Sequence, residues 1–175
     1  AEGEVRVWPL VTNEHRDGIL RVSRVVGDDP ALEARAADIV TRLVDDLGHV
    51  GVLTLELFVV GDDLVANEFA PRVHNSGHWT IEGAATSQFE NHVRAVVGMP
   101  LGPTDRTGAV AMVNCIGRLP AADRIASVEG AILHDYAKAT RRGRKVGHVT
   151  VTAPDATVLD ERLARLRAVL PGDDG

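Results

Sequence analysis

The sequence predicts an α+β fold, because short β-rich runs that pair as a hairpin share the chain with amphipathic helices. Residues 52–60 and 64–69 are rich in β-formers, and residues 61–63 (Gly-Asp-Asp) have the length of a three-residue hairpin loop. Residues 30–47 and 156–170 repeat apolar side chains every three to four positions, as amphipathic helices do. The hairpin and the loop after it carry most of the functional argument.

The first elements follow from their end signals. We expect strands at residues 5–10 and 19–26. Residues 28–30 (Asp-Asp-Pro) predict a helix start, because an aspartate accepts hydrogen bonds from the first N–H groups and proline fits the first turn. Gly48 predicts the end of this helix, since glycine tolerates the left-handed conformation that closes many helices.

A capping box predicts a short helix after the hairpin. Ser87 and Glu90 are three residues apart, so each side chain can accept a bond from the other residue's backbone N–H. Phe89, Val93 and Val96 then fall on one side of the helix, and we expect that side to face inward.

Residues 101–105 are the best candidate for a domain boundary, because they are turn-rich and the pattern changes after them. We expect residues 1–102 and residues 103–175 to form two domains. In the second domain we expect strands at residues 108–116, 131–136 and 146–152, a short helix near 121–127 and the helix at 156–170.

Composition and charge exclude several classes of function. The chain of 175 residues has a formal net charge of −6, whereas a general nucleic-acid binder needs a broad basic surface. No apolar run approaches the roughly 18 residues of a membrane-spanning helix, so we expect no membrane partner. Cys115 is the one cysteine, which excludes an intrachain disulfide and indicates a reducing, cytoplasmic compartment. In its apolar strand we expect a buried hydrophobe, not a nucleophile.

Two glutamates of the hairpin form a candidate metal site. If the loop closes symmetrically, Glu56 lies opposite Glu68, and like charges that face one another across a sheet destabilise it. A divalent cation between them would remove the repulsion, and oxygen ligands favour magnesium. The alternative is an accident of register, because a slip by one residue would place Asn67 opposite Glu56.

A dense polar loop follows the hairpin at residues 70–80. Proline and glycine prevent a continuing strand there, and such loops carry function more often than core elements do. We expect His78 and Trp79 to pack and shape the loop. Its candidate functional side chains are Arg72, His74 and Asn75. Arg72 has a structural alternative, an ion pair with one of the two glutamates.

Five cations gather within eight residues of the second domain. They are Lys138, Arg141, Arg142, Arg144 and Lys145. In a chain of negative charge, this concentration favours a small phosphorylated ligand over a polymer. The alternative is a solvated basic turn.

The loop motif resembles a known family. Residues 67–80 read Asn-Glu-Phe-Ala-Pro-Arg-Val-His-Asn-Ser-Gly-His-Trp-Thr, after Gly-Val-Leu-Thr-Leu-Glu-Leu-Phe at 51–58. They resemble the 5-(carboxyamino)imidazole ribonucleotide synthases, purine-pathway members of the ATP-grasp superfamily. The resemblance continues at residues 15–20, 86–95, 134–138 and 143–148. Val73 departs from it, because the family usually has proline there.

The resemblance implies a ligase that uses ATP and magnesium to carboxylate 5-aminoimidazole ribonucleotide with bicarbonate, through carboxyphosphate. It implies the C-terminal lobe of an ATP-grasp domain, an antiparallel sheet with helices, followed by a small mixed β/α domain. The N-terminal domain and the glycine-rich nucleotide lid of the family are not in this sequence, so we expect a fragment of a homodimeric protein. The alternatives are an inactive fragment or half-subunit, and another ATP-grasp carboxylase or transformylase.

The resemblance also implies roles at the nucleotide and metal. Glu56 and Glu68 would hold magnesium against the triphosphate. ATP would be contacted by His15, Asn67 and Glu68. His15 has a plain alternative as a surface turn residue.

The remaining candidates would bind the other substrates. Arg72 would offer a planar fork to bicarbonate or carboxyphosphate oxygens, which lysine cannot reproduce. His74 and Asn75 would orient that anion or the acceptor amine. Lys138 and Arg144 would bind the 5′-phosphate of the ribonucleotide, as their matching positions do in the family.

Overall fold

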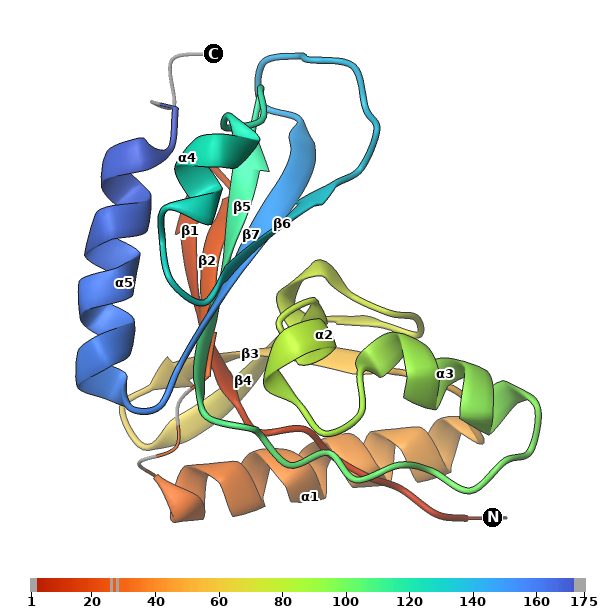
Figure 1. Cartoon of the computed structure of the whole chain (residues 1–175). Helices are drawn as coiled ribbons and strands as arrows, with labels where there is room; N and C mark the ends of the chain where they lie inside the picture. The colour runs from red at the N-terminus through yellow and green to blue at the C-terminus, as the bar shows by residue number, and fades with distance from the viewer. Residues whose placement is uncertain (1–2, 26, 28, 172–175) are drawn as a thin grey trace. The chain divides into compact units, whose positions relative to one another are not determined.

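The computed structural model describes residues 3–25, 27 and 29–171 (Figure 1). Contacts within the chain divide it into two compact units, residues 1–10 with 26–106 and residues 11–25 with 107–175. Each unit is described by itself. In the described part of the chain, no helix combines the length and the apolar character that crossing a membrane requires.

The first unit is built on one long helix and one hairpin. Its elements are α1 (Pro30–Leu47), β3 (Thr54–Val60), β4 (Asp63–Ala70), the 3-10 turn η1 (Asn75–Gly77), α2 (Thr80–Gly83) and α3 (Gln88–Val96). The Asp29 side chain accepts the Leu32 N–H at the start of α1, and Gly48 ends the helix in the left-handed region with φ of 55°. Both predicted end signals of α1 are confirmed, while residues 26 and 28 lie outside the described part.

The hairpin pairs Glu56 with Glu68 as predicted, but its turn is shorter than predicted and a bulge compensates for the difference. Its turn contains two residues, Gly61 and Asp62, so the predicted three-residue loop is wrong. From the pair Val60–Asp63 to the pair Leu57–Ala66 the register has no shift. The register shifts at the next residue, where Asn67 is an extra residue of β4 and forms a bulge, and Glu56 pairs with Glu68 as predicted.

Helix α3 buries polar side chains, contrary to the sequence-based prediction. Ser87 caps α3 by accepting the Glu90 N–H, as predicted. Gln88 and Asn91 are buried, however, because both of their side chains bond to the backbone of neighbouring loops. The three apolar residues expected to face inward lie on exposed surface instead, namely Phe89, Val93 and Val96.

The second unit is a five-stranded antiparallel sheet covered by two helices. The strand order is β1-β2-β5-β7-β6. The strands are β1 (Val11–Arg16), β2 (Ile19–Val25), β5 (Ala109–Ile116), β6 (Ala131–Asp135) and β7 (Lys145–Ala153). The helices are α4 (Ala122–Ala126) and α5 (Ala156–Val169), which lie on one face of the sheet (Figure 1).

Two sequence-based boundaries differ from the structure. The first strand begins at Val11, so the strand expected at residues 5–10 is wrong. That segment is fixed by other bonds: the Trp8 indole donates to the Thr86 carbonyl and the Thr104 hydroxyl donates to the Val7 carbonyl. In addition, the hairpin of residues 11–25 belongs to the second unit by its contacts, because β2 pairs with β5.

The core of the second unit lies between the sheet and its two helices. Alternate residues of β5 and β7 face α4 and α5, as the two-residue period of a strand requires. Leu159, Leu163 and Leu166 of α5 complete this core. Cys115 lies within it, and burial raises the pKa of its thiol to about 12. The prediction of a buried cysteine is therefore confirmed.

Candidate functional site

The hairpin and the loop after it gather acidic and imidazole groups in the first unit. Glu56 on β3 and Glu68 on β4 face each other across the ladder. One ligand atom from each of Glu56, Glu68 and His74 lies within 4.8 Å of the others. The predicted acid pair thus forms, and the loop adds an imidazole beside it.

The bulge explains how three residues of the hairpin meet. In a β-bulge two residues of one strand oppose a single residue of the other. Asn67 therefore also lies against Glu56, and its Nδ2 donates to Glu56 Oε2 at 3.3 Å. The two registers considered from the sequence are not exclusive, because the bulge brings both Asn67 and Glu68 to Glu56.

The electrostatics of the pair fit a divalent cation. The Glu56 side chain is only 15% exposed, and its one ion-pair contact among the described residues is to His74, with 3.9 Å between Nε2 and Oε1. No lysine or arginine in the described ranges neutralises either glutamate. Two carboxylates and an amide oxygen are hard oxygen ligands, which magnesium prefers. These residues fit that ion.

The loop is folded by bonds within itself and by α3. His74 caps η1, because its Nδ1 accepts the Ser76 N–H at 3.3 Å and lies 2.8 Å from the Ser76 hydroxyl. The Thr80 hydroxyl donates to the Gly77 carbonyl and accepts the Gln88 N–H. These contacts hold the loop close to the end of the hairpin.

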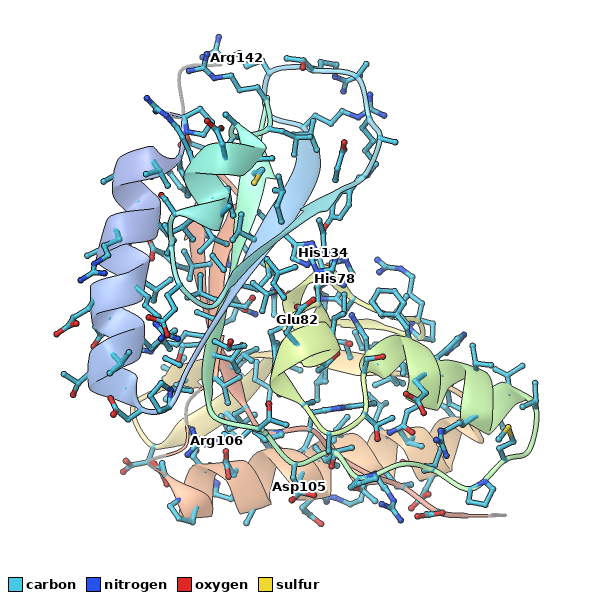
Figure 2. The ribbon with its side chains drawn as sticks, viewed as in Figure 1. His78, Glu82, Asp105, Arg106, His134 and Arg142 are labelled. Carbon is cyan, nitrogen blue, oxygen red and sulfur yellow. The ribbon has the colours of Figure 1, made fainter. Side chains whose placement is uncertain are left out.

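The other predicted residues of the loop take distinct positions. Arg72 is exposed, and its Nη1 donates to the Val73 carbonyl at 3.0 Å, so the alternative ion pair with Glu56 or Glu68 does not form. Asn75 is half-buried as the first residue of η1. Trp79 is buried, as expected of a packing residue. His78 lies just before α2, with its ring centroid 5.3 Å from that of Phe89 (Figure 2).

The structure places the remaining predicted site residues in the second unit. His15 is exposed on β1, where it pairs with Leu20 beside a bulge. The ammonium of Lys138 lies 4.9 Å from the centre of the Tyr136 ring, a cation–π contact. Arg144 is half-buried, and its carbonyl accepts the Gly117 N–H. The acid pair and its loop form one group, and these three residues belong to the other unit.

A partly buried polar cluster next to Lys138 was not predicted from the sequence. The Tyr136 hydroxyl lies 2.8 Å from His148 Nδ1, and the rings of His134 and His148 stack with centroids 4.4 Å apart. His148 also pairs with Asn114 of β5, whose Nδ2 donates to the Leu20 carbonyl. His134 and His148 pair directly across β6 and β7. The sequence signal that could have predicted the cluster is the position of these two histidines within the two predicted strands.

Gln88, which binds the loop from α3, was also not predicted as a site residue. Its buried side chain contacts both backbone polar groups of His74 and the imidazole of His78. A single polar residue at the start of a helix carries no sequence signal for such a contact.

Two family models match the chain. A model described as ATP-grasp domain matches residues 1–89. A model described as phosphoribosylaminoimidazole carboxylase C-terminal domain matches residues 110–162. The matched segments leave residues 90–109 between them, which include the predicted boundary.

Curated relatives match nearly the whole of this chain. The N5-carboxyaminoimidazole ribonucleotide synthase of Pseudomonas aeruginosa is 50% identical over 97% of this chain and 47% of its own length. The protein of the same name from Vibrio cholerae is 48% identical over 96% of this chain and 44% of its own. The chain therefore spans about half the length of the curated relatives it matches.

Solved structures agree with these matches. The N5-carboxyaminoimidazole ribonucleotide synthetase of Thermus thermophilus superposes with a TM-score of 0.93 at 53% identity, over 97% of this chain and 48% of that one. The Aspergillus clavatus N5-carboxyaminoimidazole synthase, solved with ADP and 5-aminoimidazole ribonucleotide, gives 0.85 at 32% identity, over 93% and 47%.

Proposed function

The chain belongs to the ATP-grasp family, and from this premise we propose that it forms part of an N5-carboxyaminoimidazole ribonucleotide synthase. This ligase carboxylates the amine of 5-aminoimidazole ribonucleotide with bicarbonate at the expense of ATP. The observation that carries the proposal is the acid pair Glu56 and Glu68 with His74 beside it, all within 4.8 Å. The names of the relatives and of the Aspergillus complex support the choice of substrates.

The proposed reaction has two steps. A bicarbonate oxygen attacks the γ-phosphorus of ATP, which forms carboxyphosphate and releases ADP. The exocyclic amine then attacks the carboxyl carbon, loses a proton and releases inorganic phosphate. The first step brings two anions together and the second releases an anionic phosphate, so the site has to supply positive charge and oriented N–H donors.

The hairpin would supply the metal-binding part of this site. Glu56, Glu68 and the amide oxygen of Asn67 would hold magnesium. When bound, the ion neutralises phosphate charge. Asn67 is set by the bulge and already contacts Glu56 Oε2, so it also orients the carboxylate. We propose Asn67 and Glu68 as contacts to ATP, and the role of His15 stays a prediction.

The loop would bind the bicarbonate-derived anion. Arg72 is exposed and pairs with no carboxylate among the described residues, so its guanidinium can meet a planar carboxylate or carboxyphosphate through two N–H groups. His74 and Asn75, on the capped turn η1, would orient the same anion or the amine.

The basic turn of the second unit would bind the 5′-phosphate. The Lys138 ammonium lies over the Tyr136 ring, which restricts it without neutralising its charge. Arg144 is half-buried in the residue just before β7. Two cations in the same basic segment suit a dianionic phosphate.

We also propose that residues 1–102 are the C-terminal part of an ATP-grasp domain and residues 103–175 a small C-terminal domain, with the hairpin of residues 11–25 adding its two strands to the sheet of the second unit. The two family models support this division, because they match residues 1–89 and 110–162. A homodimer and a cytoplasmic location stay predictions.

A second candidate is that this chain alone is catalytically inert and contributes only metal and substrate contacts. It is favoured by the length comparison, since the chain spans 47% of the Pseudomonas relative. The experiment therefore uses two samples, this chain alone and the chain fused to the half of the Pseudomonas relative that it does not match. We call the second sample the fusion enzyme.

The fusion enzyme is incubated with ATP, the ribonucleotide and ¹⁸O-labelled bicarbonate. We expect one labelled oxygen in each inorganic phosphate, because a bicarbonate oxygen becomes the bridge to phosphorus. Unlabelled phosphate would reject the carboxyphosphate route. Turnover by this chain alone would reject its proposed inertness, and turnover with formate or biotin but not the ribonucleotide would reject our choice of substrate.

A further inference from the structure

We infer that Gln88 is a positioning residue that fixes the loop of residues 74–78 and sets the tautomer of His78, while the turn that His74 caps sets the tautomer of His74. As a result, His74 and His78 present Nε2–H donors suited to an oxyanion rather than lone pairs suited to a metal. The inference rests on the proposed function only for its ligand, the bicarbonate-derived anion. The tautomers themselves follow from hydrogen-bond geometry.

The orientation of the Gln88 amide is fixed by its backbone partners. The His74 N–H lies 2.9 Å from Gln88 Oε1, and the His74 carbonyl lies 2.8 Å from Gln88 Nε2. A backbone N–H can only donate and a carbonyl can only accept, so the amide oxygen and nitrogen cannot be exchanged. The residue is 2% exposed, so water does not compete for these hydrogen bonds.

The second N–H of the same amide then determines the tautomer of His78. Gln88 Nε2 lies 2.8 Å from His78 Nδ1. Because the amide nitrogen is a donor, His78 Nδ1 has to accept, and the proton of the neutral ring lies on Nε2. A proton on Nδ1 would place two donors against each other.

His74 reaches the same tautomer through the turn that it caps. Its Nδ1 accepts the Ser76 N–H at 3.3 Å, and the Ser76 hydroxyl lies 2.8 Å from the same nitrogen and can donate to it. The proton is thus on Nε2, which lies 3.9 Å from Glu56 Oε1. A metal ligand needs a lone pair on that nitrogen. In this arrangement the side of His74 nearest the acid pair carries an N–H and no lone pair, so His74 does not complete a metal site with Glu56 and Glu68.

Gln88 thereby couples helix α3 to the acid pair without contacting it. It holds the backbone of His74 on both sides, and His74 aims Nε2 at Glu56. This coupling accounts for the burial of a polar residue in α3, a helix whose apolar side was expected to face inward. His78, labelled before α2 in Figure 2, belongs to the same loop and is held by the same amide.

The test measures the tautomers directly on this chain by ¹⁵N NMR of labelled histidine, which distinguishes protonated from unprotonated ring nitrogens. We expect Nε2–H signals for both His74 and His78. An Nδ1–H tautomer at His78 would overturn the inference whatever the activity of the protein. This measurement needs no variant, so a folding failure cannot obscure it.

The variant Gln88→Glu keeps the shape but removes both N–H donors. We expect His78 to gain a proton on Nδ1, because the carboxylate accepts there. The matched control is Asn91→Asp on the same helix, since the buried Asn91 side chain also bonds both backbone groups of one residue, Gly102. Asn91→Asp should leave the His78 tautomer unchanged. An unchanged tautomer in Gln88→Glu would also overturn the inference.

Kinetics of the fusion enzyme test the ligand. Gln88→Glu should raise the KM for bicarbonate about tenfold or more, because His78 with its proton on Nδ1 no longer offers an Nε2–H donor to the anion. The KM for ATP should change little. Equal effects of Gln88→Glu and Asn91→Asp on bicarbonate would show a merely structural role and reject the positioning role. If the fusion enzyme is inactive while both tautomers are as expected, the proposed function fails and the assignment of the tautomers stands.

Discussion

Glu56 and Glu68 face each other across β3 and β4 because two departures from the simplest hairpin cancel. The turn is one residue shorter than the sequence predicts, which alone would place Asn67 opposite Glu56. The bulge at Asn67 adds that residue back. The two carboxylates and the amide therefore lie together, and the proposed metal site of the first unit depends on this geometry.

Arg144 is expected to bind the ribonucleotide phosphate. In the fusion enzyme, Arg144→Ala should raise the KM for 5-aminoimidazole ribonucleotide about tenfold to a hundredfold, the range for loss of a charge-assisted hydrogen bond, with little change for ATP. Arg142→Ala is the matched control, because Arg142 is an exposed cation of the same turn (Figure 2). Steady-state kinetics check both variants, and equal effects on both substrates would contradict the assignment.

Tyr136 is expected to stabilise the second unit through its hydroxyl. Tyr136→Phe leaves buried His148 Nδ1 without the bond that now measures 2.8 Å, and should lower the free energy of unfolding by about 1–3 kcal/mol. Tyr136→Leu should cost more, because it also removes the ring below the Lys138 ammonium. Urea unfolding of this chain checks both, and a Phe variant as stable as the wild type would show that the bond contributes nothing.

Gly130 is expected to be required for close packing as well as for its backbone conformation. A Cβ at Gly130 would collide with the Thr152 carbonyl, whereas a Cβ at Gly18 would meet nothing within 4 Å, although φ is similar at the two, +73° and +71°. Gly18→Ala should therefore cost about 1–2 kcal/mol from backbone strain alone. Gly130→Ala should cost clearly more in the same unfolding assay, and equal losses would contradict the predicted collision.

Cys115 is expected to make stability fall at alkaline pH. Burial raises the pKa of its thiol from 9.0 to about 12, so the unfolded chain loses this proton at a lower pH than the folded chain does. The contribution is fully present below pH 9 and is lost as the pH rises toward about 12. Urea unfolding at several pH values should show a steeper alkaline loss for the wild type than for Cys115→Ala. Parallel curves would mean that the thiol ionises equally in both states.

The sequence predicts most of the helices and strands because their end signals are local. Asp29 and Gly48 act on backbone groups within one turn of α1, so both are readable without knowledge of the fold. The segment at residues 5–10 was mispredicted because its structure does not depend on local signals. Its β-rich composition permits a strand, yet its bonds go to Thr86 and Thr104, which only the folded chain brings near.

Residue types predict which side chains belong to the candidate site. They do not predict the backbone geometry that brings these side chains together. The acid pair follows from two carboxylates in apolar strands, although the turn and the bulge that align them do not. The orientation of α3 was mispredicted because periodicity assumes that apolar side chains are buried. Here Gln88 and Asn91 are buried instead, since the loops that they hold have backbone groups to satisfy.

The most direct test of the account is where a divalent cation binds on the first unit. Mn²⁺ is titrated as a paramagnetic stand-in for magnesium into the ¹⁵N-labelled chain, with Glu161→Gln on the exposed face of α5 as the control variant. We predict that it broadens the amide signals around Glu56 and Glu68 first, that Glu68→Gln abolishes this effect, and that Glu68→Gln leaves thermal stability almost unchanged because it relieves a repulsion. Broadening centred on other acidic residues, or broadening at the hairpin that survives Glu68→Gln, would contradict the account.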